Sequence, residues 1–222
     1  MVRVLRSLPF ALEFTIVVSL AFGQFVVTSL LVAFGLLVIP QTTASLVHLV
    51  IFEIGIMAVV FPFLRVRGWT FEKIGFRPAL KDTGIGIVLF IAGYAAWAFV
   101  WYATVLVSPR VAAGMSGSRV FTESIHPAVS LAVGLVNPFF EEVFVCGYLM
   151  TALKRYPQLA LNVSVALRVL YHLYQGPKGV LSITPIGLIF SSWYARTGRL
   201  WPLVVAHSIF DLIALLTAGY VH

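Results

Sequence analysis

The stretch Asn137-Pro-Phe-Phe-Glu-Glu-Val-Phe-Val-Cys-Gly-Tyr-Leu-Met150 places two adjacent carboxylates, Glu141 and Glu142, inside an apolar run of membrane-spanning length. An ionised side chain near the centre of a bilayer costs at least about 2.5–3.5 kcal/mol on membrane-insertion scales. Two neighbouring carboxylates cost more, because like charges repel each other. Helix formation and packing gain nothing from such a pair. We therefore interpret the two glutamates as part of a functional site inside the membrane.

The composition of the whole chain excludes an ordinary soluble domain. Its 222 residues are 60% hydrophobic and only 10% charged, whereas charged residues make up about 25% of a typical soluble domain. We predict one integral membrane domain over residues 1–222, surrounded by the lipid bilayer. The net charge of +7 does not indicate a nucleic-acid partner, because the basic residues lie in short loops between apolar segments.

Breaks that contain proline, glycine or basic residues divide the chain into seven apolar segments. The predicted fold class is therefore all-α, a polytopic bundle of about seven transmembrane helices. The loop at 65–82 carries spaced apolar residues, which indicate either a short interfacial helix or a solvated basic loop. The predicted spans cover about 12–39, 43–64, 83–107, 127–150, 158–175, 179–195 and 200–220.

The distribution of basic residues predicts the orientation of the chain. With the N-terminus inside, the inner loops contain eleven arginines and lysines and the outer loops contain three, while the fifteenth, Arg168, lies within a span. Short cytoplasmic loops are enriched in arginine and lysine. We therefore predict a multi-pass protein with a cytosolic N-terminus, in the plasma membrane if the source is prokaryotic.

Ionisable residues in the early spans are interpreted as structural. Glu13 lies near the inner end of the first span, where we expect an interfacial residue. His48 and Glu53 lie in the second span and are five residues apart, so they do not share a helix face well. We expect them to make structural hydrogen bonds between helices.

Polar residues in three later spans are four residues apart, a spacing that places them on one face of a helix. Two histidines, three carboxylates and one arginine are difficult to explain as structural groups in hydrocarbon, so these faces predict one shared site. The pairs at this spacing are Asn137 with Glu141, Glu142 with Cys146, Arg168 with His172, and His207 with Asp211.

Three motifs in these spans resemble those of the CPBP family, which is named for CAAX proteases and bacteriocin-processing enzymes. The resemblance covers about residues 130–215, and the motifs read Glu141-Glu142-x-x-x, Tyr171-His172-Leu-Tyr-Gln-Gly176 and Trp201-Pro-x-x-x-Ala-His207-x-x-x-Asp211. The family comprises intramembrane endopeptidases, including the type II CAAX prenyl proteases. The resemblance implies an endopeptidase that acts on a membrane-associated or lipidated protein or peptide.

The resemblance also implies roles for the residues. Glu141 is the expected general base, which activates water with help from His172, and His207 with Asp211 is expected to stabilise the oxyanion. This mechanism needs no metal, and we expect no cofactor. Zinc stays open as an alternative, with Glu141, His172 and His207 as ligands and a free position for water. The expected supporting residues are Asn137, Glu142, Cys146 and Arg168.

One position departs from the family pattern. The first motif of the family ends in arginine, as Glu-Glu-x-x-x-Arg, whereas this chain has Cys146 there. Glu142 therefore lacks a cation on its own helix face. An intramembrane arginine should face a carboxylate, so we predict that Arg168 pairs with Glu142 from the fifth span. The alternative is an Arg168 side chain that extends toward the membrane interface.

Two other functions are compatible with these residues. Intramembrane glutamate, histidine and arginine also occur in proton-coupled transporters, although the chain shows no repeated halves and no paired broken helices. A protease-like immunity or chaperone protein with impaired catalysis is the other alternative, and the cysteine at position 146 favours it over the transporter.

Overall fold

The computed structural model describes residues 5, 7–116 and 123–217, and the regular structure in that part of the chain is helical throughout. This confirms the predicted all-α class, and seven helical segments there overlap the seven predicted spans. They are Phe10–Ala33 (α2, Phe10–Val18; the π-helical η1, Ser19–Gly23; α3, Gln24–Ala33), α4 (Thr43–Val66), α5 (Leu80–Val107), Pro127–Met150 (α7, Pro127–Glu142; the π-helical η2, Val143–Met150), α8 (Pro157–His172), α9 (Gly176–Thr197) and α10 (Trp201–Thr217). The short helices α6 (Pro109–Ser116) and η3 (Leu173–Gln175) lie in the connections.

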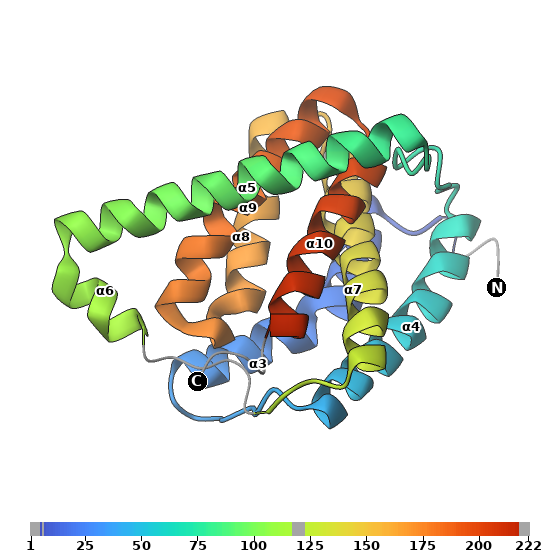
Figure 1. Ribbon diagram of the computed structural model, residues 1–222. Coiled ribbons are helices and arrows are strands. Elements are labelled where there is room, and N and C mark those ends of the chain that lie inside the picture. Colours follow the sequence, from blue (N-terminus) through green and yellow to red (C-terminus); the bar gives the residue numbers. More distant parts are fainter. Residues whose placement is uncertain (1–4, 6, 117–122, 218–222) are drawn as a thin grey trace.

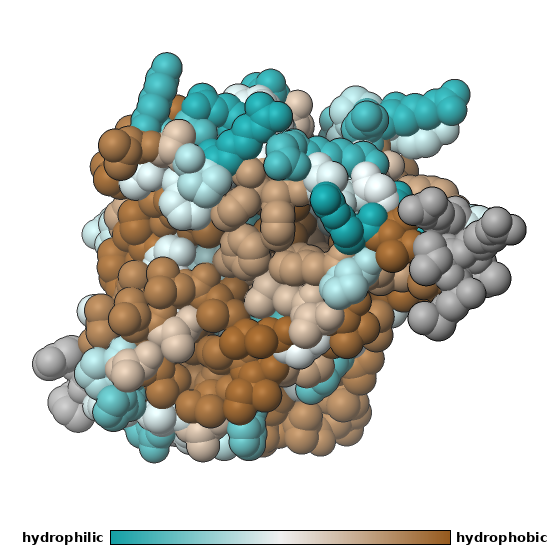
Figure 2. Space-filling view, turned by 90° about the vertical axis from the view of Figure 1, so that its right-hand side faces the viewer, coloured by the Kyte–Doolittle hydropathy of each residue, from teal (hydrophilic) through white to brown (hydrophobic). Residues whose placement is uncertain are grey.

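Four of these segments are long and apolar enough to cross a membrane: Phe10–Ala33, α4, α5 and Pro127–Met150. Large apolar side chains on α5 are openly exposed, including Phe99 at 75% and Leu106 at 81%. Figure 2, which faces the side of the molecule where α4 lies, shows a second broad hydrophobic surface below a hydrophilic upper edge. An apolar surface of this extent suits contact with lipid tails, so the described residues form a helical membrane bundle.

Local sequence explains where several helices begin and end. Thr42 and Ser45 form a capping box that starts α4, because the side-chain oxygen of each residue accepts a hydrogen bond from the backbone N–H of the other. Pro157 opens α8 in the first turn, where a missing backbone N–H does no harm. Gly198 takes a left-handed conformation (φ 62°) and ends α9.

The segment Pro127–Met150 is the centre of the bundle. In its most apolar window 61% of the residues are buried, against 17–22% in the other three long spans. In Figure 1, α7 and α10 lie side by side near the middle, and α5 crosses over α10 toward one end. A Cβ atom at Gly134 would lie 2.6 Å from Leu212 side-chain atoms, so glycine there permits the close approach of α7 and α10.

One boundary prediction is corrected. The first span was expected to run to residue 39, but α3 ends at Ala33 and Gly35 takes a positive φ of 70°. Of the two alternatives for the loop at 65–82, the interfacial helix is wrong, because the loop contains turns, and its buried Ile74 anchors it to the core. Residues 218–220 of the last predicted span, together with Arg3, Arg6 and Arg119 of the loop-charge prediction, lie outside the described residues.

Candidate active site

All the predicted site residues meet in the interior of the bundle. They come from α7 and η2 on one side, from α8 on the second side and from α10 on the third. The carboxylates and imidazoles are at most 9% exposed, apart from Asp211, whose side chain is 22% exposed. A π-helical segment begins directly after Glu142, a widening of the helix that is frequent at functional sites.

Glu142 is fully buried and has a partner on each oxygen. Arg168 Nη2 donates to Oε2 at 2.6 Å, and His207 Nδ1 lies 2.8 Å from Oε1. Arg168 Nη2 also approaches Cys146 Sγ, at 3.4 Å. The prediction that Arg168 pairs with Glu142 from the neighbouring helix is confirmed, and the alternative of an interfacial arginine is wrong, because Arg168 is only 1% exposed.

Small neighbours make room for this arginine. Gly187 on α9 faces the Arg168 side chain, and a Cβ atom there would lie 3.2 Å from Arg168 Cδ. The guanidinium also lies over the ring of Phe190, with 5.9 Å between the guanidinium carbon and the ring centroid. Arg168 is thereby held in place by packing as well as by charge.

Glu141 has a different set of partners. Tyr171 donates its hydroxyl to Oε2 at 2.6 Å, and Asn137 Nδ2 donates to Oε1 at 3.3 Å. Arg168 Nη1 and His207 Nε2 stand farther away from Oε2, at 3.8 and 3.9 Å. Glu141 thus accepts two neutral hydrogen bonds, whereas Glu142 carries the close ion pair.

The two histidines are fixed through their Nδ1 atoms. His172 Nδ1 lies 2.9 Å from the backbone oxygen of Arg168. Because a carbonyl oxygen can only accept, Nδ1 carries the proton and a neutral His172 has a free lone pair on Nε2. His207 uses Nδ1 at Glu142, and its Nε2 points between Glu141 and Asp211, with 3.5 Å to Asp211 Oδ1. The second oxygen of Asp211 is buried and has no hydrogen-bond partner among the described residues.

A cavity of about 290 Å³ opens onto this cluster. Glu141, His172 and Asp211 line it, whereas Glu142 is fully buried and does not. Of the two adjacent glutamates, only Glu141 can therefore contact a molecule in the cavity. The other lining residues are Phe25, Gln41, Leu46, Leu49, Val133, Asn137, Tyr171, Tyr174, Gln175, Ala214 and Leu215.

Two residues near the cluster were not assigned to the site from the sequence. Tyr171 was quoted as part of a motif but given no role, and it makes the shortest hydrogen bond to Glu141. Glu53 makes an interhelical hydrogen bond, as expected, but its partner is the site residue Asn137, at 2.7 Å. The other oxygen of Glu53 is buried without a partner among the described residues. Glu53 could have been assigned from the sequence because an ionisable side chain in an apolar span has a high free-energy cost.

The expectation that Glu13 is interfacial is wrong. Glu13 is 3% exposed and accepts hydrogen bonds from Arg67 Nε (2.5 Å), Trp69 Nε1 (2.9 Å) and the Tyr148 hydroxyl (3.1 Å). These bonds tie the loop after α4 to α2 and η2. The cluster belongs to the scaffold and contains none of the site residues.

The structure also bears on which side chains could bind a metal ion. Within residues 5, 7–116 and 123–217, no group of three or more histidine, cysteine, aspartate or glutamate side chains is arranged to hold a metal ion. Glu141 and His207, two of the three ligands of the zinc alternative, are 3.9 Å apart through Oε2 and Nε2.

Comparison with known proteins identifies a family for the site region. The family model described as Type II CAAX prenyl endopeptidase Rce1-like matches residues 123–213. Neither a comparison with curated proteins nor one with solved structures finds a match. The match covers α7, η2, α8, α9 and most of α10, the elements that carry the clustered residues except Glu53. Residues 123–213 thus resemble the Rce1-like type II CAAX prenyl endopeptidases, intramembrane proteases, which confirms the family resemblance predicted from the three motifs.

Proposed function

We propose that this protein is an intramembrane endopeptidase that hydrolyses a peptide bond in a membrane-associated or lipidated protein or peptide, with water activated by Glu141. The observation that carries the proposal is the difference between two adjacent carboxylates. Glu141 faces the cavity and accepts hydrogen bonds from neutral donors, whereas Glu142 is buried behind it in an ion pair. One carboxylate is thereby available for proton transfer and the other holds the site together.

Glu141 is the proposed general base. A base must reach the proton that it removes, and Glu141 is the glutamate that lines the cavity where a water could bind. The Tyr171 hydroxyl and the Asn137 amide fix the direction of its two oxygens. His172 would help to orient the water, because its Nε2 is left free to accept a hydrogen bond when Nδ1 donates to the backbone.

His207 and Asp211 are the proposed stabilisers of the tetrahedral intermediate. Glu142 holds His207 through Nδ1, which leaves Nε2 as the atom directed toward Glu141 and Asp211. A protonated Nε2 in this place can donate to a developing oxyanion. The unpartnered Asp211 oxygen offers a second donor when the carboxyl is protonated, and when ionised it orients His207 instead.

The Arg168–Glu142 pair supports a working enzyme over an impaired relative. The cysteine at position 146 raised the question of what neutralises Glu142. Arg168 supplies the cation from α8, with Nη2 2.6 Å from Glu142 and 3.4 Å from Cys146 Sγ. The guanidinium therefore lies where a side chain from position 146 would also reach.

The test is the replacement Glu141→Gln, which keeps the shape of the side chain and cannot accept the proton. We expect cleavage to fall by at least ~10²–10⁴-fold, the usual contribution of a general base, with unchanged membrane insertion and thermal unfolding. Membrane proteomes of cells with the unmodified protein and with Glu141→Gln should differ in specific cleaved products. Glu72→Gln, at an exposed glutamate of the loop after α4, is the matched control and should leave the products unchanged. Turnover retained in Glu141→Gln would refute the assignment.

A further inference from the structure

The active-site cavity lies toward one end of the bundle. Its lining includes Gln41 from the α3–α4 connection, Gln175 from η3 and Leu215 from the last turns of α10. These segments gather at the lower end of the molecule in Figure 1, together with the start of α7. We call this the cavity end.

A second cavity extends the first one sideways. It measures about 240 Å³ and shares the side chains of Phe25, Gln41, Leu46, Leu49, Tyr171 and Tyr174 with the active-site cavity. It continues between α3 and α4, where Thr28 and His48 line it. The two cavities therefore adjoin along this shared wall, and we refer to them together as the recess, which extends from between α3 and α4 to Glu141.

The opposite side of the site is closed by aromatic rings. Phe140 and Phe144 flank the two glutamates in sequence and are 0% and 1% exposed. Their rings pack edge to face at a centroid distance of 5.0 Å, and Phe22 and Phe61 extend the contact at 5.8 and 5.7 Å. No lining residue of the recess comes from the loop after α4, the α7–α8 connection or the α9–α10 connection.

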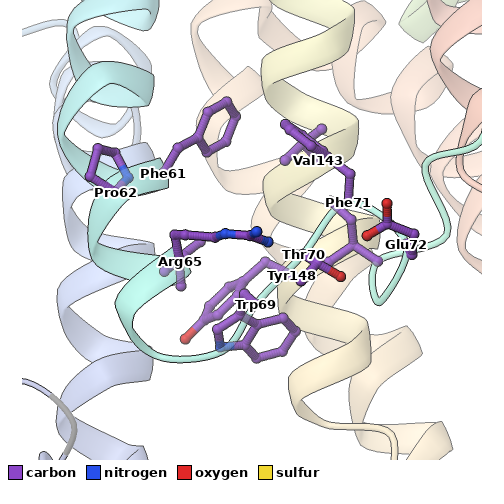
Figure 3. Close-up of a pocket in the computed structure, with 11 residues that line it drawn as sticks. Phe61, Pro62, Arg65, Trp69, Thr70, Phe71, Glu72, Val143 and Tyr148 are labelled. Atoms are coloured by element: carbon purple, nitrogen blue, oxygen red, sulfur yellow. The ribbon is translucent and has the colours of Figure 1, made fainter.

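A cavity of about 540 Å³ near the end of α4 is not an alternative entrance to the site. Figure 3 shows Arg65, Trp69 and Glu72 around it, at the end of α4 and in the following loop. Val143 and Tyr148 form its wall toward the centre, but none of the site residues lines it. It adjoins the aromatic layer, since Phe61 both lines this cavity and packs against Phe144.

Positive charge is concentrated at the end that is closed. Seven exposed arginines and lysines gather there, whereas the described cavity end has the exposed Arg110 and the half-buried Lys178, which lies over the Trp101 ring. This asymmetry places the basic end in the cytosol. The seven are Arg65, Lys73, Arg77, Lys81, Lys154, Arg155 and Arg196.

We propose that the active site takes its substrate from the extracytoplasmic side of the membrane, through the recess between α3 and α4. The inference rests on the proposed function and specifies its substrates. They are proteins or peptides whose cleavable segment lies at the outer face, rather than proteins presented by the cytosol. The segment is apolar next to the scissile bond, because apolar side chains such as Leu46, Leu49 and Val133 line the recess.

Cysteine labelling tests the access route without relying on turnover. Single cysteines at Gln41 and Leu49 report on the mouth and the interior of the recess, and one at Lys73 reports on the basic end. Each is made both in Cys146→Ala and with the fully buried Cys146 retained, so that a folding defect of one background does not decide the result. A membrane-impermeant thiol reagent is applied to intact spheroplasts and to inverted vesicles.

We expect Gln41→Cys and Leu49→Cys to react in spheroplasts and Lys73→Cys to react only in inverted vesicles. Leu49→Cys that reacts from the same side as Lys73→Cys, or from neither side, overturns the proposal. The cleaved products that depend on Glu141 give a second readout, because their cut sites should lie at the outer ends of membrane segments. Cut sites on cytosolic segments overturn the access route alone, whereas absence of Glu141-dependent products overturns the proposed function and leaves the labelling result standing.

Discussion

Replacement of Arg168 is the most informative perturbation of the site. The guanidinium donates to Glu142 at 2.6 Å, approaches Glu141 at 3.8 Å, and both glutamates are less than 10% exposed. Water cannot replace the lost cation at such depth. Removal of one partner of a buried ion pair costs about 3–5 kcal/mol, in contrast to about 0–1 kcal/mol for an exposed pair.

The expected loss can be measured as thermal unfolding in detergent, followed by tryptophan fluorescence. For a chain of this size, 1 kcal/mol corresponds to about 2–4 °C in Tm, so Arg168→Ala should lower Tm by roughly 6–20 °C. Arg168→Met is the matched control, because it keeps the aliphatic volume beside Gly187 and removes only the charge. It should lose most of the same stability.

Cys146 offers a specific rescue. Arg168 Nη2 lies 3.4 Å from Cys146 Sγ, so the volume emptied in Arg168→Ala is within reach of an arginine at position 146. Cys146→Arg alone should destabilise the protein, since it adds bulk and a second cation to a fully buried position. In Arg168→Ala the same change should restore more than half of the lost stability. This rescue tests whether Glu142 requires a cation, whichever helix carries it. A double variant no more stable than Arg168→Ala would refute that idea.

Three further outcomes are expected. His172→Ala and His207→Ala should each reduce cleavage by several orders of magnitude, and the double variant should be little worse than either, because groups of one site act as a unit; additive losses would argue against a shared site. Exhaustive chelation of purified protein should leave cleavage unchanged, whereas stoichiometric zinc that is lost together with activity would establish the zinc alternative. Tyr171→Phe should reduce cleavage without a comparable loss of Tm, because it removes a hydrogen bond from Glu141 and keeps the ring that stacks on Phe22 at 5.1 Å; unchanged cleavage would remove Tyr171 from the mechanism.

The helices were predictable because the membrane restricts the backbone conformations that a spanning segment can adopt. Backbone groups in hydrocarbon must be paired within a helix, so apolar length and the breaks around Pro157 and Gly198 were sufficient to place most of the segments. The sequence did not show that α3 ends at Ala33, because the apolar run continues to Ile39 and the end depends on the backbone angle of Gly35. The π-helical turn of η2 was equally hidden, since its residues have no pattern that distinguishes them from an α-helix.

The site was predictable where ionisable side chains lie in apolar spans, because their transfer into hydrocarbon costs free energy that a structural role alone does not recover. Spacing of four residues assigned faces on three helices, and the search for a partner of Arg168 led to Glu142. The same reasoning failed for Glu13 and Glu53, because spacing within one helix says nothing about residues contributed by others. Glu13 receives donors from Arg67, Trp69 and Tyr148, and Glu53 receives one from Asn137; these partners are 54 to 135 residues away in sequence.

The balance of charge in the buried cluster bears on how it can perform hydrolysis. Four carboxyls, from Glu53, Glu141, Glu142 and Asp211, surround one guanidinium and two imidazoles. If all four were ionised and both imidazoles neutral, a largely buried region would hold three uncompensated negative charges, which burial does not permit. The cluster must therefore bind protons, and neighbouring groups that interact strongly share them as a set. Peptide hydrolysis needs one proton removed from water and one delivered to the leaving nitrogen. The proposed general base, Glu141, can perform both steps when the proton that it takes from the water passes on to the leaving nitrogen.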